Sequence, residues 1–157
     1  MILREFCDRD VEAVARVFRD AVLITGLQGY SPAQVDAWAR ATDDRREFAA
    51  RLKRGVTLVA EVGGSIVAFG QLDAIDHLDM IYCQPTLGRR GISSAIYAEL
   101  ERRARKRVVK AIHAEASKVS RSFFEKHGYS VIEVERVVRF GSEFERFKMQ
   151  KSLEAIR

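Results

Sequence analysis

The sequence has little of several residue types and segments that mark particular protein classes. It contains two prolines and two cysteines among 157 residues, and its first ten residues, MILREFCDRD, hold no apolar stretch of a signal peptide. No apolar run approaches the ~18 residues that a membrane-spanning helix needs. Cys7 and Cys83 do not suggest a disulfide framework. These absences predict a globular cytoplasmic protein with no membrane partner and no disordered tail.

The composition suits a globular chain with a sizeable core. Hydrophobic residues make up 47% and charged residues 31%, and the length predicts one domain over residues 1–157. The net charge of +5 is compatible with a phosphate-bearing ligand or with nucleic acid, although many enzymes are equally basic. Since the histidines His77, His113 and His127 are isolated and no cysteine or histidine pair has a metal-ligand spacing, the sequence predicts no metal site.

The N-terminal third alternates one strand with helices. Residues 1–6 form the expected opening strand, and Asp8 is the expected cap of a helix. Apolar residues recur in that helix at helical spacing, namely Val11, Val14, Ala15, Phe18 and Val22. After a loop at 25–31, Ser31 and Pro32 predict a second helix start. A third helix is expected at about 44–53.

The rest of the chain is richer in strands. Strands are expected at 56–62, 65–72, 76–83, 108–116, 129–140 and 143–153. Gly63-Gly64 predicts a two-residue turn between the first pair, and the last hairpin is expected around Gly141-Ser142. A long helix follows Gly91, and a short one at 120–128 ends at Gly128. This order predicts an α/β or α+β fold with a mixed sheet.

The segment QPTLGRRGISSAIYAEL (84–100) places basic and small residues at the start of the long helix. The first turn of a helix has free backbone N–H groups and the positive end of the helix dipole. Small residues at Gly91, Ser93 and Ser94 let an anion approach those groups, and Arg89 and Arg90 add positive charge. The segment therefore predicts a pyrophosphate site, with an ordinary basic helix start as the alternative. It matches neither the Walker A nor the G-x-G-x-x-G pattern.

The order of elements together with this loop resembles the GNAT superfamily of acyl-CoA-dependent N-acyltransferases over nearly the whole chain. The family has an apolar strand, proline, and then roughly Q/R-x-x-G-x-G/A. Here Gly91 takes the first small position and Ser93 the second, while Gly88 stands where the family has Q or R, so Arg89 and Arg90 are expected to supply that donor. The resemblance implies a mostly antiparallel central sheet with helices on both faces.

The resemblance also implies acetyl-CoA as the donor substrate. The pantetheine arm would lie between two splayed strands, beside Ile81, Tyr82 and Cys83. The pyrophosphate would lie on the residues of the helix start: Arg89, Arg90, Gly91, Ile92, Ser93 and Ser94. Ser117 and Ser120 are expected either to bond the arm or to cap the short helix.

The resemblance places catalysis on the strand that leads into this loop. In some relatives a glutamate on this strand is the base, and the corresponding position here is His77, whose side chain has an unperturbed pKa of ~6.5. Asp79 is a second candidate, and strand alternation predicts that His77, Asp79, Ile81 and Cys83 share one face. The alternative for His77 is a surface hairpin residue.

The family often has a tyrosine as the proton donor where this chain has Phe124, which has no proton to give. Phe124 is therefore expected to pack beside the thioester and to exclude water. If a proton donor is used, Tyr82 or Tyr30 is the candidate.

The acceptor is expected to be a primary amine that attacks the thioester directly. Asp73, Asp76 and Asp79 form an acidic patch that would attract a cation, although a polar turn is the better interpretation of Asp76. Tyr30 and Trp38 are candidate walls of the acceptor site, with core packing as the alternative for Trp38.

Other functions remain open at this point. The basic run 101–110 suggests nucleic-acid binding, but it lies at a helix C-terminus, where cations meet the dipole favourably. Glu99 and Glu101 also lie within helical reach of its arginines, which favours a solvated helix end. A non-catalytic acyl-CoA-binding module is the second alternative, and Phe124 is its main support. A homodimer through the C-terminal strands occurs in related folds.

Overall fold

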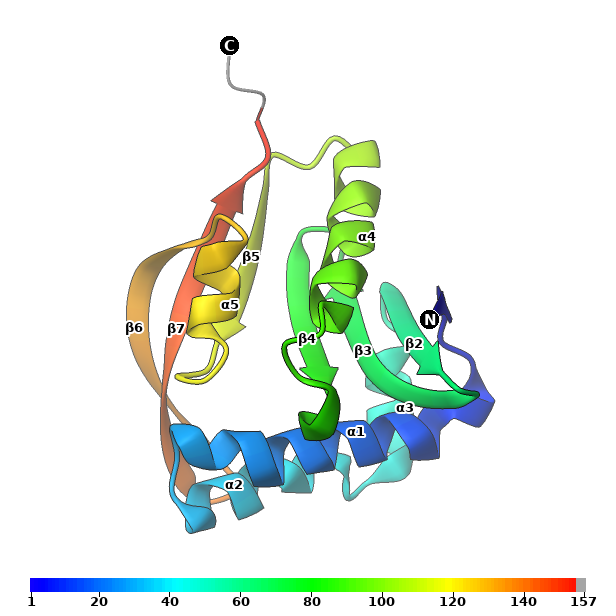
Figure 1. The fold of residues 1–157 in the computed structure, drawn as a ribbon. Helices are drawn as coiled ribbons and strands as arrows, with labels where there is room; N and C mark the ends of the chain where they lie inside the picture. Colours follow the sequence, from blue (N-terminus) through cyan, green and yellow to red (C-terminus); the bar gives the residue numbers. More distant parts are fainter. Residues whose placement is uncertain (155–157) are drawn as a thin grey trace.

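The structure is a computed structural model that describes residues 1–154. A single seven-stranded sheet with the order β1-β2-β3-β4-β5-β7-β6 carries helices on both faces (Figure 1). The strands are β1 (Ile2–Glu5), β2 (Val56–Val62), β3 (Ser65–Asp73), β4 (His77–Cys83), β5 (Ala111–Ala116), β6 (Ser130–Arg139) and β7 (Ser142–Ser152). The helices are α1 (Val11–Ile24), α2 (Pro32–Ala39), α3 (Arg45–Leu52), α4 (Ile92–Lys106) and α5 (Arg121–Lys126). The expected mostly antiparallel mixed sheet is confirmed.

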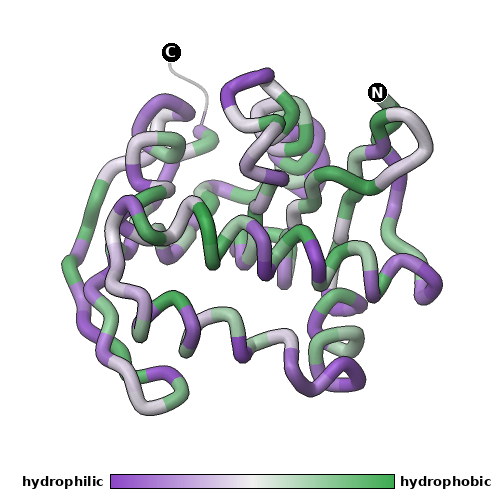
Figure 2. The backbone as a smooth tube through the Cα atoms, turned by 60° about the horizontal axis from the view of Figure 1, so that its bottom comes forward, coloured by the Kyte–Doolittle hydropathy of each residue, from purple (hydrophilic) through white to green (hydrophobic). Residues whose placement is uncertain are grey.

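Two apolar layers lie on opposite faces of this sheet. On the α4 face, α4 and α5 pack against side chains such as Leu58, Leu72 and Met149. On the α1 face, the first three helices pack against Val59, Phe69 and other side chains. Figure 2 shows α1 crossing this face, with hydrophobic and hydrophilic residues alternating along it. Each fully buried large apolar side chain contributes roughly 1.5–3 kcal/mol.

The helix starts agree with those predicted from the sequence, with one exception. Ser31 caps α2 by accepting a hydrogen bond from the Gln34 backbone N–H at 3.1 Å, as predicted. Asp8 does not cap α1: its side chain is 77% exposed and pairs with Lys53. A short 3-10 turn (Asp8–Asp10) intervenes, and Asp10 accepts the Cys7 N–H at 2.9 Å while it pairs with Arg4. The carboxylate that organises this turn is thus two residues later than expected.

The hairpins are close to their predicted positions. Gly63 and Gly64 both have positive φ, as a two-residue turn between β2 and β3 requires. In the last hairpin, Arg139 pairs with Ser142, so that the turn is Phe140-Gly141, one residue before the prediction. Strand β5 begins at Ala111 instead of residue 108, because Val108 has a φ of +57° and is exposed.

Strands β4 and β5 pair in parallel over a short stretch and then diverge. Their register contains only His77 with His113 and Leu78 with Ala114. A bulge in β4 lies at this point: Leu72 pairs with Leu78 and Gln71 with Met80, which leaves Asp79 as the extra residue. The divergence opens the centre of the sheet, and the bulge sets which side chains face each side of the opening.

The bulge overturns the prediction that four β4 residues share one face. Ile81 and Cys83 pack on the α4 face together with Leu78. Asp79 instead pairs with Arg51 of α3, on the α1 face, where Met80 and Tyr82 also pack. Strand alternation predicts the wrong face here because the one extra residue shifts the side chains that follow it to the opposite face of the sheet. Within residues 1–154, no helix is long and apolar enough to cross a membrane.

Candidate functional site

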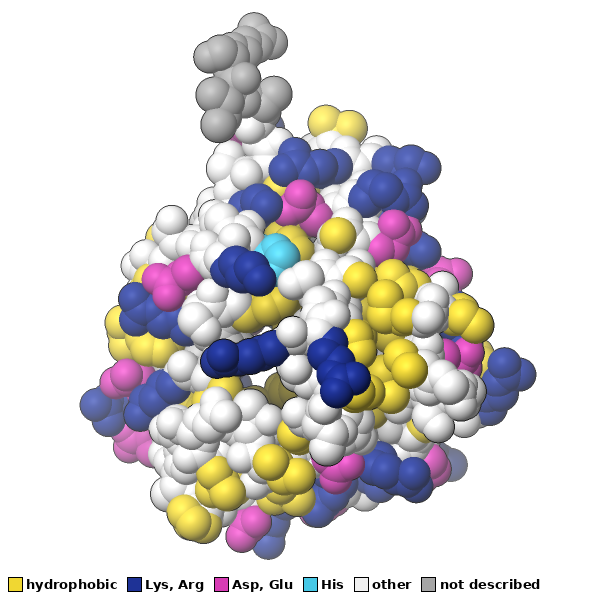
Figure 3. Space-filling model, viewed as in Figure 1, with side chains coloured by type: hydrophobic (Ala, Val, Ile, Leu, Met, Phe, Trp, Pro, Cys, Tyr) yellow, Lys and Arg dark blue, Asp and Glu magenta, His cyan; other side chains and the backbone are white. Residues whose placement is uncertain are grey.

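The opening between β4 and β5 holds a cavity of about 700 Å³ that reaches both faces of the sheet. From the α4 face it is lined by Ser117, Ser120 and Phe124, and from the α1 face by Trp38, Asp79 and Glu115, among others. Figure 3 shows the mouth on the α4 face as a hollow with Lys or Arg side chains beside it. Since the cavity passes through the sheet, two molecules can reach its centre from opposite sides.

The start of α4 lies at the rim of this cavity, where Gly88 and Arg89 are lining residues. Gly91 is the N-cap residue with φ +80°, and no side chain of the described chain caps the helix. A Cβ on Gly91 would meet nothing within 4 Å, so glycine is needed here for its backbone conformation and not for space. The first turn has no acidic residue, and its backbone N–H groups are therefore suited to an anion.

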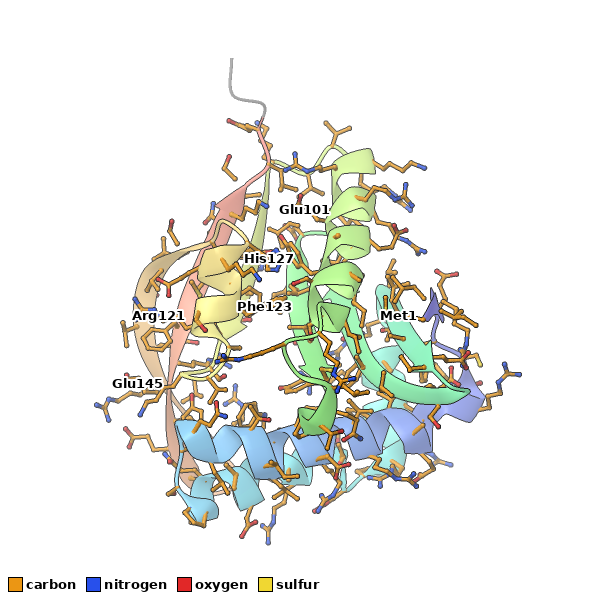
Figure 4. All side chains as sticks on the ribbon, viewed as in Figure 1. Met1, Glu101, Arg121, Phe123, His127 and Glu145 are labelled. Carbon is orange, nitrogen blue, oxygen red and sulfur yellow. The ribbon has the colours of Figure 1, made fainter. Side chains whose placement is uncertain are left out.

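The residues after Gly91 fix the helix and leave its first turn partly open. Ile92 is buried and anchors this end in the core, while Ser93 and Ser94 are half-buried and Arg90 is exposed. Ser94 Oγ lies 3.1 Å from His127 Nε2 at the end of α5. Figure 4 shows Phe123 and His127 projecting from α5 toward α4. The two helices are thus joined beside the mouth of the cavity.

Ser117 and Ser120 form the turn that starts α5. Ser117 Oγ accepts the backbone N–H groups of Val119 and Ser120 at 3.2 and 3.0 Å. Ser120 Oγ accepts the N–H of Ser117 at 3.0 Å. Both hydroxyls therefore hold the turn before α5 together, but the N-cap residue Ser120 makes no side-chain cap hydrogen bond to the helix, so the predicted capping by Ser120 is wrong. Both residues line the cavity.

Aromatic side chains close the cavity beside α5. Phe124 lines it, is 4% exposed, and packs against Phe123 and Tyr129 with ring centroids 5.6 and 5.1 Å away. Phe124 therefore presents a buried apolar ring to the cavity, and its role in excluding water stays a prediction. On β4, burial raises the pKa of the Cys83 thiol, which disfavours its thiolate form.

Tyr82 belongs to the α1 side of the cavity. Its ring lies 4.6 Å from that of Phe18, 5.6 Å from Phe69 and 6.2 Å from Trp38. Burial raises the pKa of its phenol well above the usual range, because the charged form is poorly solvated there. The hydroxyl therefore keeps its proton at neutral pH, and it is a weaker acid than the hydroxyl of an exposed tyrosine.

Asp79 and Arg51 form an ion pair in the wall of the cavity. Arg51 Nε and Asp79 Oδ2 are 2.8 Å apart, and the Asp79 side chain is 14% exposed. Both residues line the cavity. Asp79 is thus brought to the site as predicted, but with a permanent positive partner that the sequence did not indicate.

A second carboxylate, Glu115, was not predicted. It lies on β5, lines the cavity, and holds its Oε2 2.6 Å from His77 Nε2. This hydrogen bond raises the pKa of His77, and the same contact lowers the pKa of Glu115. The His113 ring stacks on His77 at 4.8 Å. His77 reaches the site through Glu115, since it is not itself among the described residues that line the cavity.

A signal for Glu115 was present in the sequence. In the strand AIHAEA, Ile112, Ala114 and Ala116 are buried on the α4 face, so that a charged residue between them must face the other side of the sheet. What the sequence does not show is that this other side lines a cavity.

Tyr30 and Trp38, the two candidate walls of an acceptor site, lie on the α1 face, where Trp38 also packs against the core as the alternative predicted. Tyr30 and Trp38 line the cavity and pack edge-on at 5.8 Å, with Phe144 beside both. The Tyr30 hydroxyl donates to the Glu145 carbonyl at 2.7 Å and accepts the Lys118 N–H at 3.0 Å. It is therefore already engaged within the protein, which argues against Tyr30 as a proton donor.

The other two aspartates of the predicted acidic patch lie elsewhere. Asp73 ends β3, 3.4 Å from Arg54, and is not among the described residues that line the cavity. Asp76 borders a separate pocket beside β5 and β7. The patch is divided because a tight turn follows Asp73, whereas the β4 bulge turns Asp79 inward.

Half of the six basic residues in the run 101–110 form ion pairs at the end of α4. Arg102 and Arg103 lie 2.7 and 3.1 Å from Glu99, and Arg105 lies 3.1 Å from Glu101. The predicted helical pairing is confirmed, and it supports a solvated helix end.

Comparisons with known proteins agree with this geometry. The model of the acetyltransferase (GNAT) domain family matches residues 27–153. The uncharacterized N-acetyltransferase YafP of Escherichia coli strain K12 is 30% identical over 149 residues, which cover 94% of this chain and 93% of the relative.

Solved structures extend the likeness to three dimensions. A GCN5-related N-acetyltransferase from Rhodopseudomonas palustris superposes with a TM-score of 0.94 at 33% identity, over 97% of this chain and 95% of the other. The PaiA N-acetyltransferase of Thermoplasma acidophilum, solved in complex with coenzyme A, superposes with a TM-score of 0.79. The latter match, at 20% identity over 96% of this chain and 98% of the other, concerns the fold alone.

Proposed function

The chain belongs to the GNAT acetyltransferase family, and from this premise we propose that it transfers the acetyl group of acetyl-CoA to a primary amine by direct attack. The observation that carries the proposal is the cavity through the sheet, open to the uncapped start of α4 on one face and to two carboxylates on the other. We call the part facing α4 and α5 the coenzyme half and the part facing α1, α2 and α3 the acceptor half. Residues 1–157 would act as one domain.

The coenzyme half suits an extended diphosphate-containing thioester. The pyrophosphate would lie on the backbone N–H groups of residues 89–94, where the left-handed Gly91 leaves the first turn open. The arm would pass between the diverging β4 and β5, beside Ile81 and Cys83. The complex of the Thermoplasma acidophilum relative with coenzyme A supports this donor. The thioester carbon would then reach the bulge at Asp79.

The acceptor half suits a cationic amine. Asp79 and Glu115 attract an ammonium group, and Trp38, Tyr82 and Phe144 exclude water around it. After the ammonium loses one proton, the nitrogen forms a bond to the thioester carbon and the carbon–sulfur bond breaks. The thiolate takes up the second nitrogen-bound proton, and Tyr82 is the hydroxyl predicted to assist there. The products are an amide and coenzyme A.

Calorimetric titration with acetyl-CoA at fixed salt tests the donor site, with a nucleic-acid duplex as the control. Saturable one-to-one binding of acetyl-CoA and no binding of the duplex are expected. A panel of polyamines, amino acids, aminoglycosides and peptide N-termini then tests transfer through release of the free thiol. Binding without turnover of any amine would favour a non-catalytic acyl-CoA-binding module. Duplex binding without acetyl-CoA binding would favour the basic end of α4.

We also propose that two copies associate through the C-terminal strands. The edge strand β6 exposes Ile132, Val134 and Val138, and an edge strand with exposed apolar residues tends to acquire a partner. Light scattering of the wild type and of Val134→Lys would test this: a dimer that the substitution dissociates supports it, and a monomeric wild type contradicts it.

A further inference from the structure

Glu115 occupies a position that no other described residue shares. It lines the main cavity and also a second pocket, which is bordered by the β3–β4 turn (74–76), by β5 and by β7. A side chain that borders both spaces can take up a proton in one and release it in the other. Acetyl transfer from an ammonium group must release one proton to solvent for each amide formed.

The carboxylate of Glu115 is only partly engaged. Its Oε2 bonds to His77, while the structure gives Oε1 no hydrogen-bond partner within residues 1–154. The side chain is 27% exposed. One oxygen is therefore held in place, and the other is free to meet an acceptor amine in the cavity.

The two carboxylates of the acceptor half differ in the kind of partner they have. Asp79 is paired with Arg51, and an arginine keeps its charge throughout the physiological range. Glu115 is paired with His77, whose charge changes near neutral pH. Loss of the His77 proton removes the positive charge beside Glu115 and raises the affinity of Glu115 for a proton. Of these two carboxylates, only Glu115 can therefore become a stronger base when its partner loses a proton.

Other charged groups surround this pair. His113 stacks on His77 from β5, and Lys148 of β7 stands opposite Glu115 in the strand register. Arg146 of β7 adds positive charge near Glu115, which lowers the pKa of that carboxyl further. Asp73 and Asp79, in contrast, raise the pKa of the His77 imidazole. His77 thus titrates among three acidic neighbours and one histidine.

We propose that Glu115 is the general base of acetyl transfer, and that His77 is the positioning residue that sets its proton affinity. The proposal rests on the proposed function. The ammonium proton passes to Glu115 Oε1, the neutral amine attacks the thioester carbon, and the carbon–sulfur bond breaks. Glu115 then releases its proton to solvent in the second pocket. The second nitrogen-bound proton goes to the departing thiolate.

Glu115→Gln tests the base because it keeps the shape and removes the charge. With an amine that the wild type acetylates, kcat should fall about 100-fold or more, as is typical of losing a general base, while acetyl-CoA affinity stays unchanged. Glu12→Gln, which removes an exposed carboxylate on α1 that pairs with Arg45, is the control and should keep full activity. Turnover of Glu115→Gln at the wild-type rate would overturn the inference and leave the proposed function intact.

His77→Gln tests the positioning role through the pH dependence of kcat. In the wild type kcat should rise as pH increases through the pKa of His77, and this limb should be lost in His77→Gln. NMR titration of the imidazoles gives a readout without turnover: Glu115→Gln should lower the pKa of His77. An unchanged pH profile in His77→Gln would overturn the positioning role. A wild type that binds acetyl-CoA but acetylates no amine would instead contradict the proposed function, and the inference with it.

Discussion

The two halves of the cavity are built in different ways. The coenzyme half depends mainly on backbone geometry in one contiguous segment, the loop and first turn at 84–94. The acceptor half depends on side chains from α2, α3, β4, β5 and β7, which ion pairs and aromatic contacts hold together. A substitution in the first should therefore act on one ligand, whereas substitutions in the second should also affect stability.

Gly91→Glu, in the coenzyme half, should have the largest effect. The new carboxylate would lie at the backbone N–H groups proposed for the pyrophosphate, so the Kd of acetyl-CoA should rise about 100-fold, or ~2.7 kcal/mol. Calorimetric titration measures it. Gly64→Glu is the matched control, because Gly64 also has a positive φ and open space around its Cβ position, in the distant β2–β3 turn. An equal rise in the Kd of acetyl-CoA in both variants would mean that backbone strain, and not phosphate binding, explains the effect.

Trp38→Ala should weaken the acceptor half selectively. Trp38 lines the cavity and packs edge-on against Tyr30, Tyr82 and Phe144. The KM of the amine should rise about tenfold, since each such aromatic contact contributes roughly 0.5–1.5 kcal/mol. The Kd of acetyl-CoA should stay within twofold in calorimetry. An equal loss of acetyl-CoA affinity would show that the two halves are not separable at this residue.

Tyr30→Phe should affect the junction between the halves. The Tyr30 hydroxyl joins Glu145 of β7 to the loop before α5 through Lys118. Its removal leaves a carbonyl and an N–H without their partner, which should cost roughly 1–2 kcal/mol of unfolding free energy. Urea denaturation measures this loss. Retention of full stability would mean that water replaces the hydroxyl without cost.

His77→Gln should have the smallest effect on stability, and that effect should depend on pH. The pKa of His77 is raised in the folded state, so its contribution is complete below its unfolded pKa of ~6.5 and is lost as pH rises through the folded pKa. The pKa of Glu115 is lowered, so its contribution is lost only as pH falls through that value. Partly exposed pairs contribute up to about 1 kcal/mol. Wild type and variant should therefore differ more at pH 6 than at pH 9.

The sequence predicts the local structure of the segment 84–94 well because its determinants are local. A glycine that must adopt a positive φ, followed by small residues and a buried Ile92, is visible in a single segment. The strands around it follow from alternation and from turn residues such as Gly63-Gly64. Local propensity and tertiary structure agree in these segments.

The acceptor half is less predictable because it depends on where distant segments meet. The bulge at Asp79 reverses strand alternation, and no residue type in DHLDMIYC marks it. The pairing of Asp79 with Arg51 joins residues 28 positions apart, and that of His77 with Glu115 joins residues 38 apart. Such pairs are set by packing and not by spacing. The missed residues, Arg51 and Glu115, are therefore charged groups whose partners lie on other elements.

The chain has a single tryptophan, Trp38, and it stands in the wall of the acceptor half. Its intrinsic fluorescence is therefore a natural reporter of that half alone, without a dye or a label. An amine that changes the emission in the absence of acetyl-CoA would identify itself as a ligand before any turnover is measured. Libraries of candidate acceptors can in this way be screened on the unmodified protein.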